Sequence, residues 1–155
     1  MSKKVLVIST SMRNNSNSEM LADYFLMGAK EAGHQVEKVI LKGKQIAFCN
    51  GCLACQKTGC CAIADDAVEI TEKMRYADVI AFATPIYYYE MCGQMKTMLD
   101  RANALFALDY QFRDIYMLTT AAENEASCLS VINPHSFQSI EFYLTLFYIF
   151  IISIL

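Results

Sequence analysis

Residues 3–18 read KKVLVISTSMRNNSNS. This stretch indicates the fold class, because it predicts a buried strand followed by a polar loop that leads into a helix. Its first half is a continuous apolar run after two lysines, a pattern typical of a parallel strand that is buried on both faces. Its second half, residues 10–18, is rich in Ser and Asn and predicts a polar loop. From Glu19 apolar residues recur at helical spacing, and Ala32-Gly33 gives that helix a stop.

The same alternation of strands and helices continues along the chain. Further strands are predicted at residues 35–41, 78–87 and 113–122, and further helices at residues 64–77 and 93–106. This order predicts an α/β fold with an open parallel sheet and helices on both faces. We expect one domain, in which residues 1–125 form the main unit and residues 126–155 an atypical apolar C-terminal segment.

Composition excludes several classes of function. The 155 residues carry a net charge of -3 and no polybasic block, so we expect no nucleic-acid partner. The N-terminus has a short apolar run without a small-residue cleavage site, so it is not read as a secretory signal. We therefore expect a cytoplasmic protein, in which the seven cysteines serve as thiols or metal ligands rather than as disulfides.

The C-terminal segment is apolar and nearly uncharged. Between Ser127 and Leu155 the one formal charge is Glu141, and the chain ends YLTLFYIFIISIL. The uncharged run of about 14 residues is shorter than the roughly 18–20 that a membrane-spanning helix needs, so we do not expect a membrane protein. Its Ile, Phe and Tyr content favours a buried strand, and a tail anchor is the alternative.

The loop after the first strand has the chemistry of a phosphate site. In open parallel sheets, ligands bind at the carboxyl ends of the strands. Residues 9–18 offer hydroxyls, amides and the guanidinium of Arg13, and a helix with free N–H groups follows directly. The loop lacks the glycine patterns of dinucleotide and P-loop sites. An ordinary helix-capping loop is the alternative, because Ser and Asn are favoured there anyway.

Two later strand ends favour a planar ligand. Residues 83–96 read ATPIYYYEMCGQMK, and three successive tyrosines at a strand end suit the flanks of a flat ring system. A tyrosine-rich surface or a dimer contact is the alternative. Residues 119–125 read TTAAENE. The first four have small side chains, which leave room beside a ligand. A phosphate beside a planar ring fits FMN better than a nucleoside triphosphate.

These motifs resemble the flavodoxin-like NAD(P)H-dependent FMN reductase superfamily over roughly residues 3–125. Residues 11–18 are similar to its S-x-R-x-x-[GS]-N-[ST] loop, and residues 84–89, TPIYYY, precede GQMK at 93–96 and Asp100-Arg101. The resemblance implies an FMN site in which the phosphate is held by Ser11, Arg13, Ser16, Asn17 and Ser18, one side of the ring by Pro85, Ile86, Tyr87 and Tyr88, and its other edge by Thr119, Thr120, Ala121 and Ala122.

Residues 49–61, CNGCLACQKTGCC, hold five of the seven cysteines. Three cysteines three apart and a fourth soon after can wrap one cluster. The spacing resembles that of the iron-sulfur flavoproteins, a branch of the same superfamily, and implies a [4Fe–4S] cluster on Cys49, Cys52, Cys55 and Cys61. Cys60 is then an extra thiol or an alternative ligand. Zinc, a redox-active thiol pair and free thiols are the other interpretations. Cys92 and Cys128 are predicted to be packing residues.

The resemblance implies an FMN-dependent oxidoreductase linked to NAD(P)H or to ferredoxin, in which the flavin and no side chain carries the chemistry. Its partner is a small-molecule acceptor or a redox carrier protein, and the chain forms a homo-oligomer. An FMN-only reductase of quinones or flavins and a non-enzymatic electron carrier are the alternatives. The superfamily's sheet has a fifth strand between two helices, and about 30 residues are too few for all three. We therefore expect a truncated or frame-shifted ending, in which the final apolar run replaces the fifth strand or stays unattached.

Overall fold

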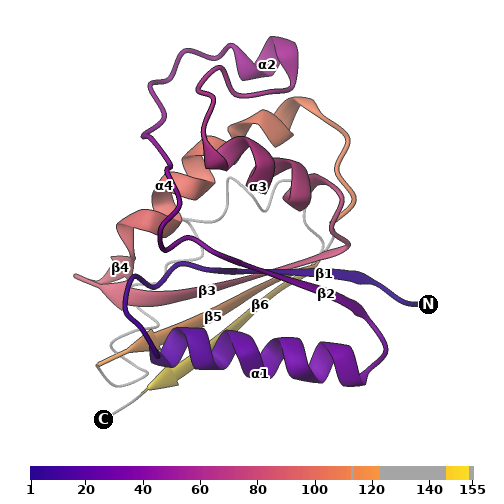
Figure 1. Ribbon diagram of the computed structural model, residues 1–155, viewed down its shortest axis with the longest axis vertical. Helices are drawn as coiled ribbons and strands as arrows, with labels where there is room; N and C mark the ends of the chain where they lie inside the picture. The colour runs from indigo at the N-terminus through magenta and orange to yellow at the C-terminus, as the bar shows by residue number, and fades with distance from the viewer. Residues whose placement is uncertain (113, 123–145, 154–155) are drawn as a thin grey trace.

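The structure is a computed structural model and describes residues 1–112, 114–122 and 146–153. Its elements in chain order are β1 (Lys4–Ser9), α1 (Asn17–Glu31), β2 (Gln35–Ile40), α2 (Cys55–Thr58), α3 (Asp66–Arg75), β3 (Val79–Tyr87), β4 (Glu90–Met91), α4 (Gly93–Arg101), the 3-10 helix η1 (Ala102–Ala107), β5 (Asp114–Ala121) and β6 (Leu146–Ser153). Strands and helices alternate as the sequence predicts (Figure 1).

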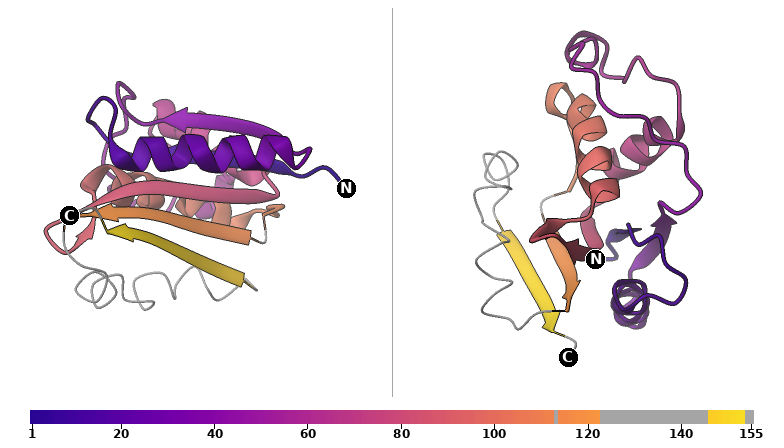
Figure 2. Two further views of the ribbon diagram at one scale, coloured as in Figure 1. Left: turned by 90° about the horizontal axis from the view of Figure 1, so that it is seen from below. Right: turned by 90° about the vertical axis from the view of Figure 1, so that its left-hand side faces the viewer.

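Five strands form one parallel sheet in the order β2-β1-β3-β5-β6, and the short β4 pairs antiparallel with β3. This is the order of a flavodoxin-like sheet, in which the chain changes direction between β1 and β3. The predicted open parallel sheet is therefore confirmed. The carboxyl ends of its strands lie together at the left of Figure 1 and face the viewer in the right panel of Figure 2.

Helices cover both faces of the sheet, as predicted. Figure 1 shows α1 below the strands and α3 and α4 above them. The residues of β1 alternate between the two layers: Val5 and Val7 join the cluster that packs on α1, whereas Leu6 and Ile8 join the larger cluster beneath α3 and α4. Because the central strands are buried on both faces, their sequences are continuous apolar runs rather than alternating ones.

The final apolar run forms the outer strand of the sheet. β6 pairs in parallel with β5 from Asp114↔Leu146 to Ala121↔Ser153. It therefore occupies the position of the fifth strand, which was one of the two alternatives expected for this segment. Residues 123–145 lie outside the described part of the chain. No helix among the described residues is long and apolar enough to cross a membrane.

Candidate functional site

Strand register brings three predicted loops to one edge of the sheet. Ser9 at the end of β1 lies opposite Ala83 of β3, and Thr84 of β3 lies opposite Thr119 of β5. The backbone N–H of Thr10 donates to the carbonyl of Ala83 at 2.9 Å, so the pairing extends into the loop after β1. The loops that follow β1, β3 and β5 therefore start side by side, as expected from neighbouring parallel strands.

In the loop after β1 the serine hydroxyls are buried and the charged guanidinium is exposed to solvent. Ser11, Ser16 and Ser18 are buried, whereas Arg13 and Asn17 are exposed. The Ser16 hydroxyl accepts from the backbone N–H of Glu19 at 3.2 Å and lies 3.3 Å from the Ser18 hydroxyl. Ser16 therefore caps α1, which begins at Asn17, two residues earlier than predicted. Capping and phosphate binding are compatible uses of this loop, because a helix N-terminus has several free N–H groups.

The residues around this loop fit a phosphate group. The Ser9 hydroxyl is buried and has no hydrogen-bond partner within the described part of the chain. A buried hydroxyl without a partner is costly, and an oxygen of a bound ligand would remove that cost. Positive charge is supplied by exposed Arg13 and by Lys42, whose ammonium contacts the side-chain oxygen of Asn14. Sequence reasoning missed Lys42, because it follows β2 and carries no motif.

Cys92 connects the first loop to the second. It is 1% exposed, precedes α4, and its sulfur lies 3.1 Å from the Thr10 hydroxyl and 3.3 Å from the Thr84 hydroxyl. It is thus buried, as predicted for a packing residue, but it also joins two polar side chains at the ligand edge. No sequence pattern pointed to this contact, because the three residues are far apart in the chain. Cys128 lies outside the described residues.

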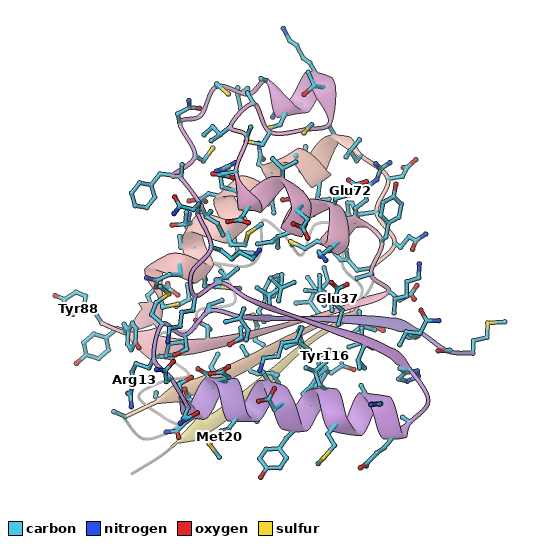
Figure 3. All side chains as sticks on the ribbon, viewed as in Figure 1. Arg13, Met20, Glu37, Glu72, Tyr88 and Tyr116 are labelled. Carbon is cyan, nitrogen blue, oxygen red and sulfur yellow. The ribbon has the colours of Figure 1, made fainter. Side chains whose placement is uncertain are left out.

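The predicted ring loop is a tight hairpin. Pro85 is buried and Ile86 half-buried, whereas Tyr87 is exposed and Tyr88, at the tip, is 97% exposed. Tyr88 and Tyr89 are the two residues between β3 and β4, and both have positive φ, 46° and 63°. Bulky residues rarely adopt this conformation, which two-residue hairpins normally fill with Asn-Gly. Figure 3 shows Tyr88 and Arg13 at the same end of the sheet.

We expect the double substitution Tyr88→Asn/Tyr89→Gly to raise the free energy of unfolding by about 2 kcal/mol or more, because each of the two strained residues costs on the order of 1–3 kcal/mol. Urea unfolding of flavin-free protein measures the effect. Tyr87→Asn is the matched control, because Tyr87 is not among the residues with positive φ. A double variant that is less stable than this control would show that the turn carries no strain.

The predicted residues at the carboxyl end of β5 line the same edge. Thr119 and Thr120 are buried, Ala121 is half-buried and Ala122 is exposed. Thr120 lies opposite Pro85 in the sheet, so this segment starts beside the hairpin. The structure therefore brings the three predicted groups of flavin-site residues to one edge, with the small side chains of β5 next to the ring loop.

The four cysteines predicted to be cluster ligands line one small hollow. Cys49 and Cys52 are exposed, Cys55 is buried and Cys61 is half-buried, and all four face the space between their own loop and the end of α4. Cys60 is exposed and is not among the residues that line this hollow. The sulfurs are not drawn together: no three Cys, His, Asp or Glu side chains of the described residues stand close enough to share a metal ion.

Two short turns direct the cysteines toward the hollow. α2 runs from Cys55 to Thr58 and is capped by Gly59, whose φ of +68° reverses the chain before Cys61. The Thr58 hydroxyl lies 2.8 Å from the carbonyl oxygen of Cys60 and 3.2 Å from that of Ala54, and its single hydrogen can be donated to either, which fixes this reversal. A Cβ at Gly59 would lie 2.6 Å from a methyl group of Leu108, so the loop also packs closely there. The sequence did not predict α2, because four residues show no helical periodicity.

A buried ion pair supports the cysteine loop, the segment of residues 49–61 that carries the five clustered cysteines. The side chain of Arg101 is fully buried and bonds both carboxylate oxygens of Asp65, at 2.6 and 2.8 Å. Burial raises the pKa of Asp65, but hydrogen bonds from Arg101 and from the backbone N–H groups of Ala47 and Ala67 more than offset it, so the pKa lies below its usual value. The donor set of this region fits an iron-sulfur cluster in type, because four thiols share one hollow and two of them accept N–H hydrogen bonds.

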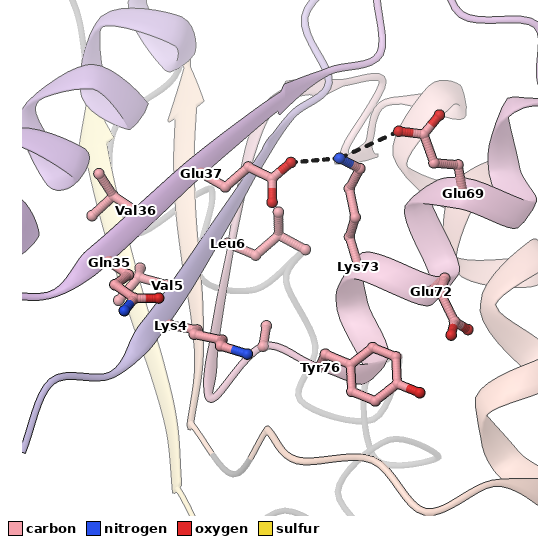
Figure 4. Close-up of a pocket in the computed structure, with 11 residues that line it drawn as sticks. Lys4, Val5, Leu6, Gln35, Val36, Glu37, Glu69, Glu72, Lys73 and Tyr76 are labelled. Carbon is pink, nitrogen blue, oxygen red and sulfur yellow. Dashed lines mark hydrogen bonds and ion pairs between the residues drawn. The ribbon is translucent and has the colours of Figure 1, made fainter.

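Another hollow, of about 520 Å³, lies at the opposite edge of the sheet between β2 and α3 (Figure 4). Three of its charged groups are paired with each other: Lys73 lies 2.5 Å from Glu37 and 3.3 Å from Glu69, which raises the pKa of Lys73. It is at the amino ends of β1 and β2 and contains none of the motif residues. We therefore place the candidate cofactor site at the carboxyl edge, where ligands of such sheets bind.

Comparison with known families agrees with this geometry. The NADPH-dependent FMN reductase family matches residues 3–136. The chain belongs to this family. The match covers the first loop, the hairpin, the cysteine loop and β5, so the family resemblance noted from the motifs is confirmed.

Several curated relatives are named iron-sulfur flavoproteins, and a more distant one, from Bacillus subtilis, is named a putative NAD(P)H-dependent FMN-containing oxidoreductase. The chain is 38% identical over 99 residues to the one from Methanosarcina thermophila, covering 64% of this chain and 52% of that protein. It is 35% identical over 111 residues to one from Methanocaldococcus jannaschii, covering 72% of this chain and 57% of that protein. The chain thus spans about half the length of the curated relatives it matches.

Solved structures show the same fold at low sequence identity. The NAD(P)H:quinone oxidoreductase from Methanothermobacter marburgensis superposes with a TM-score of 0.78 at 17% identity, over 99% of this chain and 87% of that one. An azoreductase from Bacillus anthracis superposes with a TM-score of 0.74 at 17% identity, over 99% and 87% of the two chains. These likenesses establish the flavodoxin-like fold and no more.

Proposed function

We propose that this chain is an FMN-dependent oxidoreductase that passes electrons from a reduced carrier to a small-molecule acceptor or a redox carrier protein. The observation that carries the proposal is the strand register, which brings the hydroxyl-rich loop after β1 beside the hairpin at Pro85 and the small residues after Thr119. Family membership supports FMN as the cofactor, and the family's description supports NADPH as the electron donor. A reduced ferredoxin is the alternative donor.

The buried hydroxyls of Ser11, Ser16 and Ser18 and the N–H groups at the start of α1 would hold the FMN phosphate, and Arg13 and Asn17 would add polar contacts from outside. Pro85, Ile86, Tyr87 and Tyr88 would lie along the ring, and Thr119, Thr120, Ala121 and Ala122 at its other edge. When bound, FMN supplies the hydride and electron chemistry. The protein's task is to orient the ring, so no side chain is required as a general acid or base.

We further propose that Cys49, Cys52, Cys55 and Cys61 hold a [4Fe–4S] cluster. The shared hollow, the N–H donors to two sulfurs and the names of the relatives support this assignment. When bound, such a cluster passes electrons singly. α4 begins beside Cys92 at the flavin edge and ends at Arg101 under the cysteine loop, and nine residues of helix span about 14 Å. The two proposed centres therefore lie at opposite ends of one helix.

An FMN-only reductase with free thiols is the second candidate function. It is favoured by one observation, that the described sulfurs do not converge on a common point. Either function is proposed for the cytoplasm and for a homo-oligomer, a dimer or larger, in which the exposed tyrosine hairpin is available for contact with a second copy. Cytoplasmic location is proposed because the seven cysteines suit a reducing compartment.

Arg13→Ala is expected to weaken FMN binding about 10- to 100-fold and to leave riboflavin binding unchanged. A hydrogen bond to a charged group is worth about 1.5–3 kcal/mol, and riboflavin lacks the phosphate that Arg13 would contact. Titration of the flavin-free protein with each flavin measures both affinities. Lys30→Ala is the matched control, because Lys30 is an exposed cation near the other end of α1. Wild-type protein that binds riboflavin as tightly as FMN would contradict the phosphate site.

A further inference from the structure

Arg101 uses every hydrogen-bond donor that a guanidinium has. Nη1 donates to Asp65 at 2.6 Å and to the Ala47 carbonyl at 2.9 Å, and Nη2 donates to Asp65 at 2.8 Å and to the Ile63 carbonyl at 2.9 Å. Nε lies 3.3 Å from the sulfur of Cys61. An arginine has five N–H donors in a rigid fork, so this side chain is fully satisfied and held in one orientation.

These contacts join the two ends of the cysteine loop to each other. Ala47 precedes the segment that carries the five clustered cysteines, and Ile63 and Asp65 follow it. Asp65 also accepts the backbone N–H of Ala47 at 2.9 Å, so both ends of the segment meet at one buried ion pair. The loop is therefore tied to the last residue of α4 by protein groups alone.

The end of α4 and the start of η1 supply N–H donors to two of the four sulfurs in the hollow. Arg101 contacts Cys61, and the Asn103 amide nitrogen lies 3.5 Å from the sulfur of Cys55. N–H groups and positive charge near thiolate ligands stabilise the reduced form of a bound cluster, because reduction adds one negative charge. The donors to Cys61 and Cys55 are thus placed to influence a metal centre without coordinating it.

We propose that Arg101 is a positioning residue that holds the cysteine loop closed before any metal binds and raises the reduction potential of a cluster bound there. The second half rests on the proposed [4Fe–4S] site, whereas loop closure does not. A cluster held there would be reduced by one electron as the reduced carrier of the proposed function is oxidised by one electron, and Arg101 would form and break no bond in that exchange.

Arg101→Lys tests both halves, because lysine keeps the positive charge but cannot reproduce the five-donor fork. In metal-free protein, hydrogen exchange of the backbone amides in residues 48–62 is expected to accelerate about tenfold or more, as the loss of one to two hydrogen bonds predicts. In cluster-loaded protein, the midpoint potential of the cluster is expected to fall, while that of the flavin at the far end of α4 stays unchanged. Lys96→Ala, on the exposed side of α4, is expected to alter neither quantity.

Unchanged exchange in Arg101→Lys would overturn loop closure, and an unchanged cluster potential would overturn the tuning role. Should Arg101→Lys fail to fold, Asp65→Glu keeps the carboxylate but displaces the guanidinium, and the same two shifts are expected at smaller size. Asn103→Ala is expected to lower the cluster potential without changing loop exchange. Wild-type protein that binds no iron would refute the proposed cluster and with it the tuning role, and the exchange rates would still decide loop closure.

Discussion

Asp65→Asn is expected to lower the free energy of unfolding by about 3–5 kcal/mol, the cost of leaving a buried charge without its partner. The Arg101 side chain is 0% exposed, and the Asp65 carboxylate supplies its one opposite charge among the described contacts. Asparagine keeps the shape of the side chain but not its charge, so the guanidinium stays buried and unpaired. Urea unfolding at neutral pH measures the loss.

The same substitution has a defined pH dependence. The pKa of Asp65 is lowered in the folded protein, so its contribution to stability is present above the unfolded value of about 3.9. That contribution is lost as the pH falls below about 4 and through the folded pKa. The stability difference between wild type and Asp65→Asn should therefore shrink in this acidic range. Asp23→Asn is the control: this carboxylate is 58% exposed and pairs with Lys38, so its loss should cost less than about 1 kcal/mol. Equal costs for the two variants would contradict a buried pair.

Cys61→Ala is expected to remove nearly all of the iron that wild-type protein binds, about four per chain for one [4Fe–4S] cluster. Its neighbour Cys60 provides the matched control, because Cys61 lines the hollow and accepts from Arg101, whereas Cys60 is exposed and does neither. Cys60→Ala should therefore keep its iron. Flavin content should be the same in both variants, since the flavin edge lies at the other end of α4.

Iron analysis after purification without oxygen distinguishes the interpretations of the cysteine loop. Loss of iron in Cys60→Ala but not in Cys61→Ala would make Cys60 the fourth ligand, the alternative that its spacing also allows. Zinc in place of iron would identify a structural thiolate site. Absence of both metals from wild type would leave an FMN-only enzyme with free thiols.

The sequence predicted those strands and helices that are encoded by a pattern of neighbouring residues. A continuous apolar run identified β1, and helical periodicity identified α1 and α3. α4 was predicted to continue to residue 106, but it ends at Arg101 and tightens into η1, a common way for a helix to end. The hairpin between β3 and β4 was missed, because Tyr88-Tyr89 is not the Asn-Gly signal that such turns usually carry.

The supporting contacts of the site depend on distant residues and could not be read from patterns. Arg101 and Asp65 are 36 positions apart, and Cys92 meets Thr10 across 82 positions. Motifs located the loop after β1 and the cysteine segment, because the residue types and spacing of each are unusual for an ordinary loop. Strand register is needed to show that the loops after β1, β3 and β5 share one edge of the sheet. The path of α4 is needed to show that this helix begins at that edge and ends at the cysteine loop.

The most direct test of the account is a visible absorption spectrum with flavin, iron and sulfide assays on protein purified without oxygen. We predict the bands of FMN together with a broad absorption from an iron-sulfur cluster, and about four irons per chain. A spectrum without flavin, in protein that has been offered FMN, would contradict the central claim that the carboxyl edge of this sheet is an FMN site.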